Sequence, residues 1–491
     1  MDHSKSIFNN PIRKKNYRKA EKTKEKYIKK FGDDSKVLYS LSVEENKTLY
    51  PILGIKNIVN AKSDEKIDPI NGIIIGNIRM GFGHYRISMA IASAAHAMGI
   101  TPYWFDLHSY QETSGGKIIK HLNDLYSLGS RLSQKYSLFN KYYWEPLNSE
   151  GFRQLSYNAI DQKVSECMTP IFKQIPHDMP FVATHVWPAQ AANHAGMERV
   201  INVIPDNWPM ALHLAEGSIH TVQTPSSYLG YTSLRGMDKE RSLNPMPSDQ
   251  IYDVGHYIDH ELLVNLESDC KRRLDRIEDN QAKRVLLTVG GAGAQKEIFA
   301  EIIRYLMPKI KSKEVILLIN VGDHLGVWDG LCEDIPELKS LTETHFNDWD
   351  KTLHFSQMIE ENDMSGIHAF YHEDIFAAVY STNCLMRHTD VLITKPSELA
   401  FYPVPKLMIK RVGGHEAWGA IRAQEIGDGT YECETVQSTL NMLELLLSDK
   451  ALLSSFSHNI IKAHKIGIYD GAYKVVKLAM MKNKESVSII I

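Results

Sequence analysis

The chain has 491 residues, of which 43% are apolar and 23% charged, and its formal net charge is −3 at pH 7. A chain of this length and composition can form two or three domains, each with its own core. The near balance of charge argues against nucleic acid as a partner of the whole chain. No continuous apolar run reaches the roughly 18 residues of a membrane-spanning helix, so we expect no such helix.

Five cysteines lie far apart and include no C-x-x-C pair. This spacing predicts buried, reduced thiols rather than disulfides, and therefore a cytoplasmic protein. The N-terminus shows no apolar signal segment, which favours the same location. The cysteines are Cys167, Cys270, Cys332, Cys384 and Cys433.

Lysine and arginine crowd one segment near the N-terminus, "IRKKNYRKAEKTKEKYIKKFG", where only Glu21 and Glu25 oppose them. The segment is either a solvated, partly helical arm or a basic surface for anionic lipid headgroups, where each cation adds about 1 kcal/mol. A polar linker follows around residues 60–70. We therefore assign residues 1–70 to a basic N-terminal extension.

From residue 72 onward the chain alternates strand, loop and helix. "GIIIG" predicts a buried strand, "HYRISMAIASAAHAMG" a helix and "TPYWFDL" a second strand. This alternation is typical of a parallel sheet covered by helices, so residues 71–265 are predicted to form a Rossmann-like domain. Three further strands of it are expected in "FVATHV", "RVINVIPD" and "HTVQTP".

Residues 117–175 are predicted to be mostly helical and contain many tyrosines and a tryptophan. Aromatic side chains at this density either form the core of a helical hairpin or line an apolar acceptor site. The sequence leaves both interpretations open.

A second strand-and-helix series begins with a strand over Val285–Val289, a glycine turn and a helix. "TDVLITKPSELAF" predicts a later strand that runs straight into a helix. We expect a second Rossmann-like domain over residues 266–460, facing the first across a cleft. The remaining residues, 461–491, are expected to form a helix that packs back on the N-terminal domain.

The first glycine loop, "GNIRMGFGHYR", lacks the G-x-G-x-x-G spacing of dinucleotide-binding folds and the Lys-Ser/Thr of ATPase phosphate loops. Gly81 and Gly83 still allow a ligand to approach the backbone closely, and the helix that follows presents free N–H groups. His84 stands beside that loop as a neutral-pH proton acceptor, or as a structural histidine.

The second loop, "VGGAGAQKE", carries Gly291 and Gly293 and no basic side chain, which suits a diphosphate bound by backbone amides or a simple tight turn. In the third element, Glu398 is expected near the start of a helix, where it either accepts ribose hydroxyls or caps that helix. His415 and Glu416 fall on a later loop.

Five stretches in order resemble the motifs of one family of GT-B glycosyltransferases, the group of monogalactosyldiacylglycerol synthase, processive diacylglycerol glucosyltransferase and the peptidoglycan N-acetylglucosaminyl transferase. The resemblance covers residues 72 to about 435. It rests on "GFGHYRISMAIASA", "VIPDNW", "LLTVGGAGAQKE", "VLITKPSELAFYPVPKLMI" and "GHEAWGA".

The resemblance implies an inverting, metal-independent hexosyltransferase that uses a nucleotide diphosphate sugar, such as a UDP-sugar, and needs no cofactor. His84 or Asp206 would remove the acceptor proton, and Gly81, Gly83, His185 and Trp208 would lie on the acceptor side. The acceptor would be a hydroxyl of a membrane lipid, reached by a protein peripheral to the inner face of the membrane. The implied donor-binding residues are Gly291, Gly293, Lys395, Ser397, Glu398, His415 and Glu416.

One departure bears on the donor site. The family has a longer glycine turn between Lys-Pro and Glu, whereas only Ser397 stands between Pro396 and Glu398. Residues 331–365 also have no counterpart in the pattern. Two alternatives therefore stay open: a non-hydrolysing nucleotide-sugar 2-epimerase, and a sugar-nucleotide-binding protein that retains only the fold.

Overall fold

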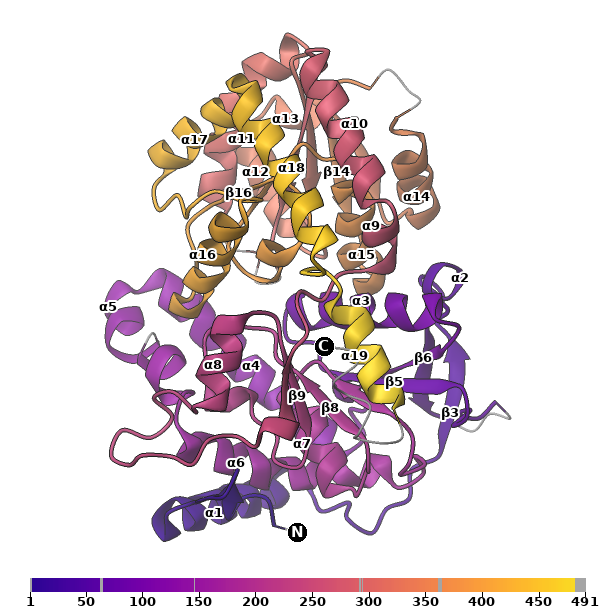
Figure 1. Cartoon of the computed structure of the whole chain (residues 1–491), viewed down its shortest axis with the longest axis vertical. Helices are drawn as coiled ribbons and strands as arrows, with labels where there is room; N and C mark the ends of the chain where they lie inside the picture. Colours follow the sequence, from indigo (N-terminus) through magenta and orange to yellow (C-terminus); the bar gives the residue numbers. More distant parts are fainter. Residues whose placement is uncertain are drawn as a thin grey trace.

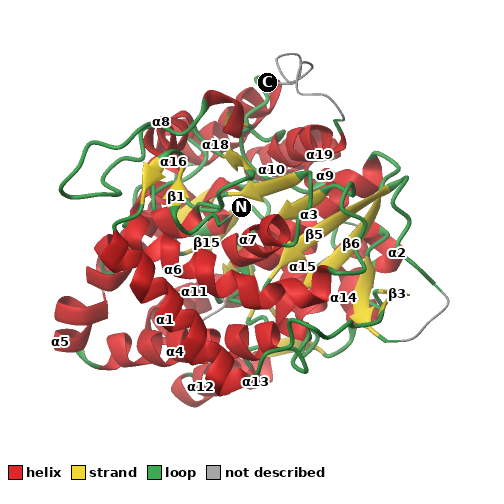
Figure 2. Cartoon of the chain, turned by 90° about the horizontal axis from the view of Figure 1, so that it is seen from below, coloured by secondary structure: helices red, strands yellow, loops and turns green. Residues whose placement is uncertain are grey.

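The computed structural model describes residues 2–61, 65–144, 146–290, 293, 295–360 and 364–481. Two α/β domains are stacked along the long axis of the molecule (Figure 1), the first built mainly from the N-terminal half of the chain. Each contains a sheet flanked by helices, which Figure 2 shows for the first domain from below. The predicted fold class of two Rossmann-like domains is confirmed by these two sheets.

The first sheet has eight strands in the order β10-β9-β8-β7-β5-β6-β4-β3. Neighbouring strands run parallel except at the edge, where β3 pairs antiparallel with β4. Central strand β5 is a continuous apolar run that is buried throughout, as expected in a parallel sheet covered on both faces. The strands are β3 (Leu41–Glu45), β4 (Lys56–Asn60), β5 (Gly72–Asn77), β6 (Thr101–Asp106), β7 (Phe181–Ala183), β8 (Val200–Val203), β9 (Ile219–Val222) and β10 (Ile251–Asp253).

Residues 1–70 differ from the separate extension that the sequence predicts. Two of their segments, β3 and β4, complete the first sheet, and α1 (Lys14–Phe31) packs against α6 (Leu155–Ser165). Lys24 of α1 also forms a 2.5 Å ion pair with Glu166. A short hairpin of β1 (Ser6–Ile7) and β2 (Asn10–Pro11) precedes the helix. Short edge strands with polar residues carry little periodicity, which is why the sequence did not reveal β3 and β4.

Helix α3 (Gly83–Ala97) connects β5 to β6 and is buried from Tyr85 to Ala95. Its alanines and serines let it lie close to β5 and to the C-terminal helix. The other helices of this domain are α2 (Tyr50–Leu53), α4 (Ser114–Lys135), α5 (Ser137–Phe139), α7 (Val186–His194) and α8 (Pro225–Thr232).

The second sheet has six parallel strands in the order β13-β14-β12-β11-β15-β16. They are β11 (Lys283–Thr288), β12 (Val315–Asn320), β13 (Thr342–Phe346), β14 (Ile367–Tyr371), β15 (Val391–Thr394) and β16 (Lys406–Met408). The helices of this half are α9 (His260–Val264), α10 (Leu266–Glu278), α11 (Lys296–Lys311), α12 (Leu325–Asp334), α13 (Leu338–Leu341), α14 (Trp349–Met358), α15 (Ile375–Met386), α16 (Ala417–Ile426) and α17 (Val436–Ser448).

The helix expected directly after Thr394 is only a four-residue 3-10 turn, Glu398–Phe401. Pro403 and Pro405 follow it closely, and proline cannot continue a helix. The prediction of a full helix at this point was therefore wrong.

The chain crosses back to the first domain at its C-terminal end. Helix α18 (Lys450–Lys465) packs against α10, and α19 (Gly471–Met480) then lies against α3, β7 and β8, where Figure 1 shows it in yellow. No helix among the described residues is both long and apolar enough to cross a membrane.

Candidate functional site

The strand order of both sheets marks where a ligand would bind. In the first sheet the chain proceeds from β5 to β6 on one side and returns to β7 on the other, and in the second sheet β12 and β15 flank β11 in the same way. Open parallel sheets bind ligands beyond the carboxyl ends of strands at such a reversal point. The loops that follow β5, β7, β11 and β15 are therefore the candidate site.

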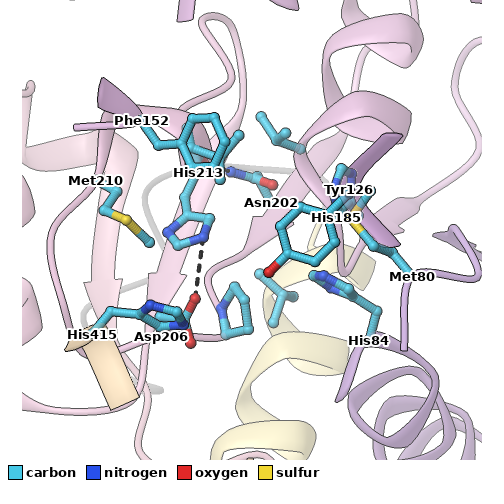
Figure 3. Close-up of a pocket in the computed structure, with 14 residues that line it drawn as sticks. Met80, His84, Tyr126, Phe152, His185, Asn202, Asp206, Met210, His213 and His415 are labelled. Carbon is cyan, nitrogen blue, oxygen red and sulfur yellow. Dashed lines mark hydrogen bonds and ion pairs between the residues drawn. The ribbon is translucent and has the colours of Figure 1, made fainter. Parts of the chain in front are cut away.

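Two cavities with six lining residues in common occupy this region. One, of about 180 Å³, lies mainly against the first domain, and the other, of about 210 Å³, lies between the domains. Figure 3 shows the first cavity, with His84 and Asp206 on facing sides. Of the residues predicted for the site, those lining the second cavity are Gly81, Gly83, His84, Asp206, Lys395, Ser397, Glu398, His415 and Glu416.

His84 lies at the start of α3, and among the described residues no hydrogen bond to its Nε2 is found. Its Nδ1 donates a hydrogen bond of 2.5 Å to the carbonyl oxygen of Thr184, which assigns the proton to Nδ1 and leaves Nε2 as an acceptor. Burial lowers the pKa of His84 below its ordinary value, so the ring is neutral at pH 7. These two features are what a general base requires.

His185 follows β7 and packs edge-on against His84, with the ring centroids 4.8 Å apart. Its Nδ1 accepts a 3.2 Å hydrogen bond from the backbone N–H of Trp187, and burial lowers its pKa well below the ordinary value. His185 therefore holds the His84 ring in place as a neutral, largely buried neighbour.

Asp206 follows β8 and is paired with His213. The His213 Nε2 lies 3.3 Å from the Asp206 carboxylate, and its Nδ1 lies 2.7 Å from the hydroxyl of Tyr231. Burial opposes ionisation of Asp206, but the hydrogen bond from His213 and the nearby His415 keep its pKa well below the ordinary value. Asp206 is thus a fixed negative charge and a poor proton acceptor at neutral pH.

Across the cleft, the partly buried Lys395 forms an ion pair with the buried Glu416. The second carboxylate oxygen of Glu416 accepts hydrogen bonds from the backbone N–H groups of Val412 (2.8 Å) and Gly413 (3.2 Å). Although burial opposes its charge, Glu416 keeps the pKa of Lys395 above the ordinary value. The pair places a fixed ammonium group beside the glycine turn that follows β11.

That turn is held open for Lys395 by glycine. A Cβ at Gly290 would lie 3.1 Å from the Lys395 Cε, and Gly293 has a φ of 62°, which side-chain-bearing residues rarely adopt. Helix α11 follows, and no side chain among the described residues caps its N-terminus. Free N–H groups at a helix N-terminus favour an anion. Gly291, also predicted for this site, lies outside the described residues.

Glu398 lines the second cavity and also faces the first domain. Its Oε2 would lie 3.3 Å from a Cβ at Gly83, so the carboxylate faces the start of α3 in the other domain. No side chain among the described residues caps α3, and a negative charge near a helix N-terminus is favourable. In this arrangement Glu398 links the domains, while Ser397 and Lys395 remain beside it in the cavity.

Trp208 is placed beside the cavity rather than in it. Its ring packs on Trp418 of the second domain, with centroids 5.5 Å apart, and the Arg153 guanidinium lies 4.7 Å from the same ring. Trp208 thus contributes to the domain contact at the rim of the site.

The lining or supporting residues that were not predicted include Tyr126, His213 and Tyr231. The His213 position carries a weak signal, because a histidine seven residues after Asp206 follows the same strand end. Tyr126 belongs to the aromatic segment, which does not form a closed core, since Tyr136, Leu138, Tyr142 and Tyr143 are exposed. No sequence pattern distinguishes Tyr126 from those neighbours.

No curated protein matches the sequence. Similar solved structures include UDP-GlcNAc 2-epimerase from Neisseria meningitidis, at 13% identity and TM-score 0.43, covering 84% of this chain and 100% of that one. The trehalose 6-phosphate synthase of Burkholderia multivorans has 10% identity and TM-score 0.44, covering 85% of this chain and 98% of that one.

A glycosyltransferase from Rickettsia africae has 11% identity and TM-score 0.39, covering 86% of this chain and 99% of that one. These likenesses are too distant to indicate a reaction. Family models match the two halves separately: residues 6–233 match a domain of unknown function, DUF6937, and residues 246–480 match a second domain of unknown function, DUF6938.

Proposed function

We propose that the chain is an inverting, metal-independent glycosyltransferase that moves a hexose from a nucleotide diphosphate sugar to an acceptor hydroxyl. One observation carries the proposal. A cavity between the domains brings the neutral His84 to one side and Lys395, held by Glu416, to the other, and the glycine turn that leads to α11 lies beside Lys395.

The first domain would supply the proton acceptor, and His84 suits that role better than Asp206. Its imidazole is neutral and its free nitrogen belongs to a residue that lines the cavity. Asp206 is held ionised by His213 and has little affinity for a proton at neutral pH. We assign Asp206 to orienting the acceptor hydroxyl or a sugar hydroxyl through its carboxylate oxygens.

The second domain would supply the donor site. Lys395 and the N-terminus of α11 would face the diphosphate, where charge builds up as the leaving group departs. His415 lines both cavities and would lie beside the sugar or the phosphate. Ser397, Gly293 and Glu416 would complete the donor contacts, with Glu416 also fixing Lys395.

In the transfer step the acceptor oxygen would attack C1 of the hexose as the bond from C1 to the phosphate oxygen breaks. The hydroxyl proton would pass to Nε2 of His84, and the nucleoside diphosphate would leave with the bonding electron pair. Attack on the face opposite the leaving group inverts the configuration at C1. Closure of the domains would exclude water, which would otherwise hydrolyse the donor.

A membrane lipid is our proposed acceptor class. The aromatic segment supplies Tyr126 to the cavity wall and exposes the apolar side chains Leu138, Tyr142 and Tyr143. Helix α1 belongs to the same domain, and its outer face exposes cations that would favour an anionic surface: Lys15, Arg18, Lys19, Lys22, Lys26, Lys29 and Lys30.

Release of nucleoside diphosphate from UDP- and GDP-linked hexoses tests the proposal. The assay compares the full chain with and without lipid vesicles that contain hydroxyl-bearing acceptors, each with and without EDTA. Acceptor-dependent release that survives EDTA supports the transferase. Conversion of the donor sugar without any acceptor would instead indicate a 2-epimerase, and binding without turnover would indicate a sugar-nucleotide-binding protein.

A further inference from the structure

The outer edge of the second sheet carries a cluster of ligating side chains that the proposed reaction does not use. Glu343 and His345 are two residues apart on β13, so both side chains lie on one face of the sheet. His368 on β14 is the residue directly opposite Glu343 in the parallel pairing. The sheet register therefore brings all three side chains together.

The spacing of the ligand atoms matches a metal site. The His345 Nε2 and His368 Nδ1 lie 3.3 Å apart, and the Glu343 carboxylate lies 3.9 Å from the first nitrogen and 3.7 Å from the second. Ligands bound about 2.1 Å from a tetrahedral metal are roughly 3.4 Å apart. The nitrogens already have that separation, and the Glu343 side chain, 54% exposed, is free to move the remaining few tenths of an ångström.

Aromatic packing fixes the positions of the two imidazoles. His345 is 1% exposed and stacks on Phe370, with a 10° angle between the rings. Phe355 packs against both histidines. The two nitrogens are therefore held close together without a metal.

We propose that Glu343, His345 and His368 bind one divalent transition metal, with Zn²⁺ as the natural probe. Two imidazole nitrogens and one carboxylate oxygen suit this class of ion, and the fourth position would take a water on the exposed side of Glu343. Among the described residues this is the one group of three such side chains close enough to share an ion.

The position indicates a structural role. β13 is the edge strand and lies three strands away from β11, the strand that carries the glycine turn of the cleft. A metal held by residues of β13 and β14 would fasten this edge strand to the sheet. Two of its three ligands, Glu343 and His345, belong to the segment 331–365, which has no counterpart in the glycosyltransferase pattern, so the site does not depend on the proposed reaction.

One neighbouring cation competes with the metal for Glu343. The Lys351 Nζ lies 3.2 Å from a Glu343 carboxylate oxygen. Removing this charge should free the carboxylate, so Lys351→Met should bind Zn²⁺ at least as tightly as the wild-type chain. If Glu343 and Lys351 formed only a surface ion pair and the histidines bound no metal, Lys351→Met would not change Zn²⁺ binding.

The test is a Zn²⁺ titration of the full chain against a chromophoric chelator, after removal of any histidine tag. We expect one Zn²⁺ per chain, with affinity lowered at least about a hundredfold in His368→Gln and about tenfold or more in Glu343→Gln. His354→Gln, which changes an exposed histidine on the adjacent α14, is the matched control and should bind as the wild type.

Two further measurements keep the test decisive if His368→Gln folds poorly. The first is Zn²⁺ binding by Glu343→Gln, because Glu343 is exposed and its replacement leaves the core intact. The second is hydrogen exchange, in which Zn²⁺ should slow the amides of residues 342–346 in the wild type only. No stoichiometric Zn²⁺ in the wild type would overturn the proposal. Equal binding by wild type and Glu343→Gln, or equal protection of β13 in both, would also overturn it.

Discussion

The glycine loops of the two domains occupy equivalent places but carry different chemistry. Each follows a central strand and precedes a helix that no described side chain caps. The loop after β5 leads to His84 at the start of α3, whereas the loop after β11 has no ionisable side chain before Lys296 and instead makes room for Lys395. Under the proposed function, the first domain would move a proton and the second would hold negative charge.

Replacement of His84 should impair proton transfer and leave donor binding intact. His84→Ala should lower transfer by about 10²- to 10⁴-fold, because general base catalysis is worth that much, while donor affinity changes little. Turnover and isothermal titration with the donor measure the two effects. His96→Ala, an exposed histidine near the other end of α3, is the control. Full turnover by His84→Ala would transfer the base role to another residue, such as Asp206.

Replacement of Lys395 should weaken binding of the donor. Lys395→Ala should weaken donor binding by about 10- to 100-fold, since a hydrogen bond to a charged group contributes about 1.5–3 kcal/mol. Lys410→Ala, an exposed lysine on the nearby loop, should leave donor affinity unchanged. If both variants bind the donor equally well, the ammonium group of Lys395 does not contact it.

Replacement of Tyr231 tests the acceptor side of the first domain. Tyr231→Phe removes the hydroxyl beside His213 and should reduce kcat/KM by about two- to tenfold, the effect of one neutral hydrogen bond. The loss should appear in acceptor KM rather than in donor binding. A change confined to donor affinity would contradict the assignment of Asp206 and His213 to the acceptor side.

The pH dependence of transfer reports which group is the base. Because burial lowers the pKa of His84, the neutral form persists below pH 6.5, and kcat/KM should rise with pH through that lowered pKa and then level off. Measured rates from pH 4.5 to 8 test this. A rising limb centred above pH 6.5 would indicate a different base.

Loss of an ion pair between the domains should have the smallest effect of these changes. Arg79 of the first domain forms a 2.6 Å ion pair with Asp323 of the second, and both side chains are partly exposed. Arg79→Ala should therefore lower the free energy of unfolding by less than about 1 kcal/mol. Calorimetry measures this change. A much larger loss would mean that this pair holds the cleft closed.

Much of the fold was predictable from the sequence because buried parallel strands are continuous apolar runs. "GIIIG" and the strand before the second glycine turn are clear for that reason. β3 and β4 were missed since edge strands need no such run, and the turn at Glu398 was predicted as a helix because its ending depends on two later prolines.

The candidate site was predictable only where a residue lies just beyond the carboxyl end of a central strand, as His84, Asp206 and Lys395 do. The sheet order brings these strand ends together, so local sequence sufficed to select them. The pairing of Asp206 with His213, the packing of His185 on His84 and the position of Glu398 against Gly83 depend on contacts between distant segments. No local pattern encodes such contacts.

The most direct test of the central claim is a thermal-shift panel of nucleoside diphosphates and their hexose derivatives, run with wild type and Lys395→Ala, with and without EDTA. Each thermal shift is the difference between the protein with and without ligand in the same buffer. Any destabilisation caused when EDTA removes a metal from β13 and β14 is therefore subtracted. The account predicts that one nucleotide sugar stabilises the wild type in both buffers and stabilises Lys395→Ala far less. No stabilisation by any member of the panel would contradict the account.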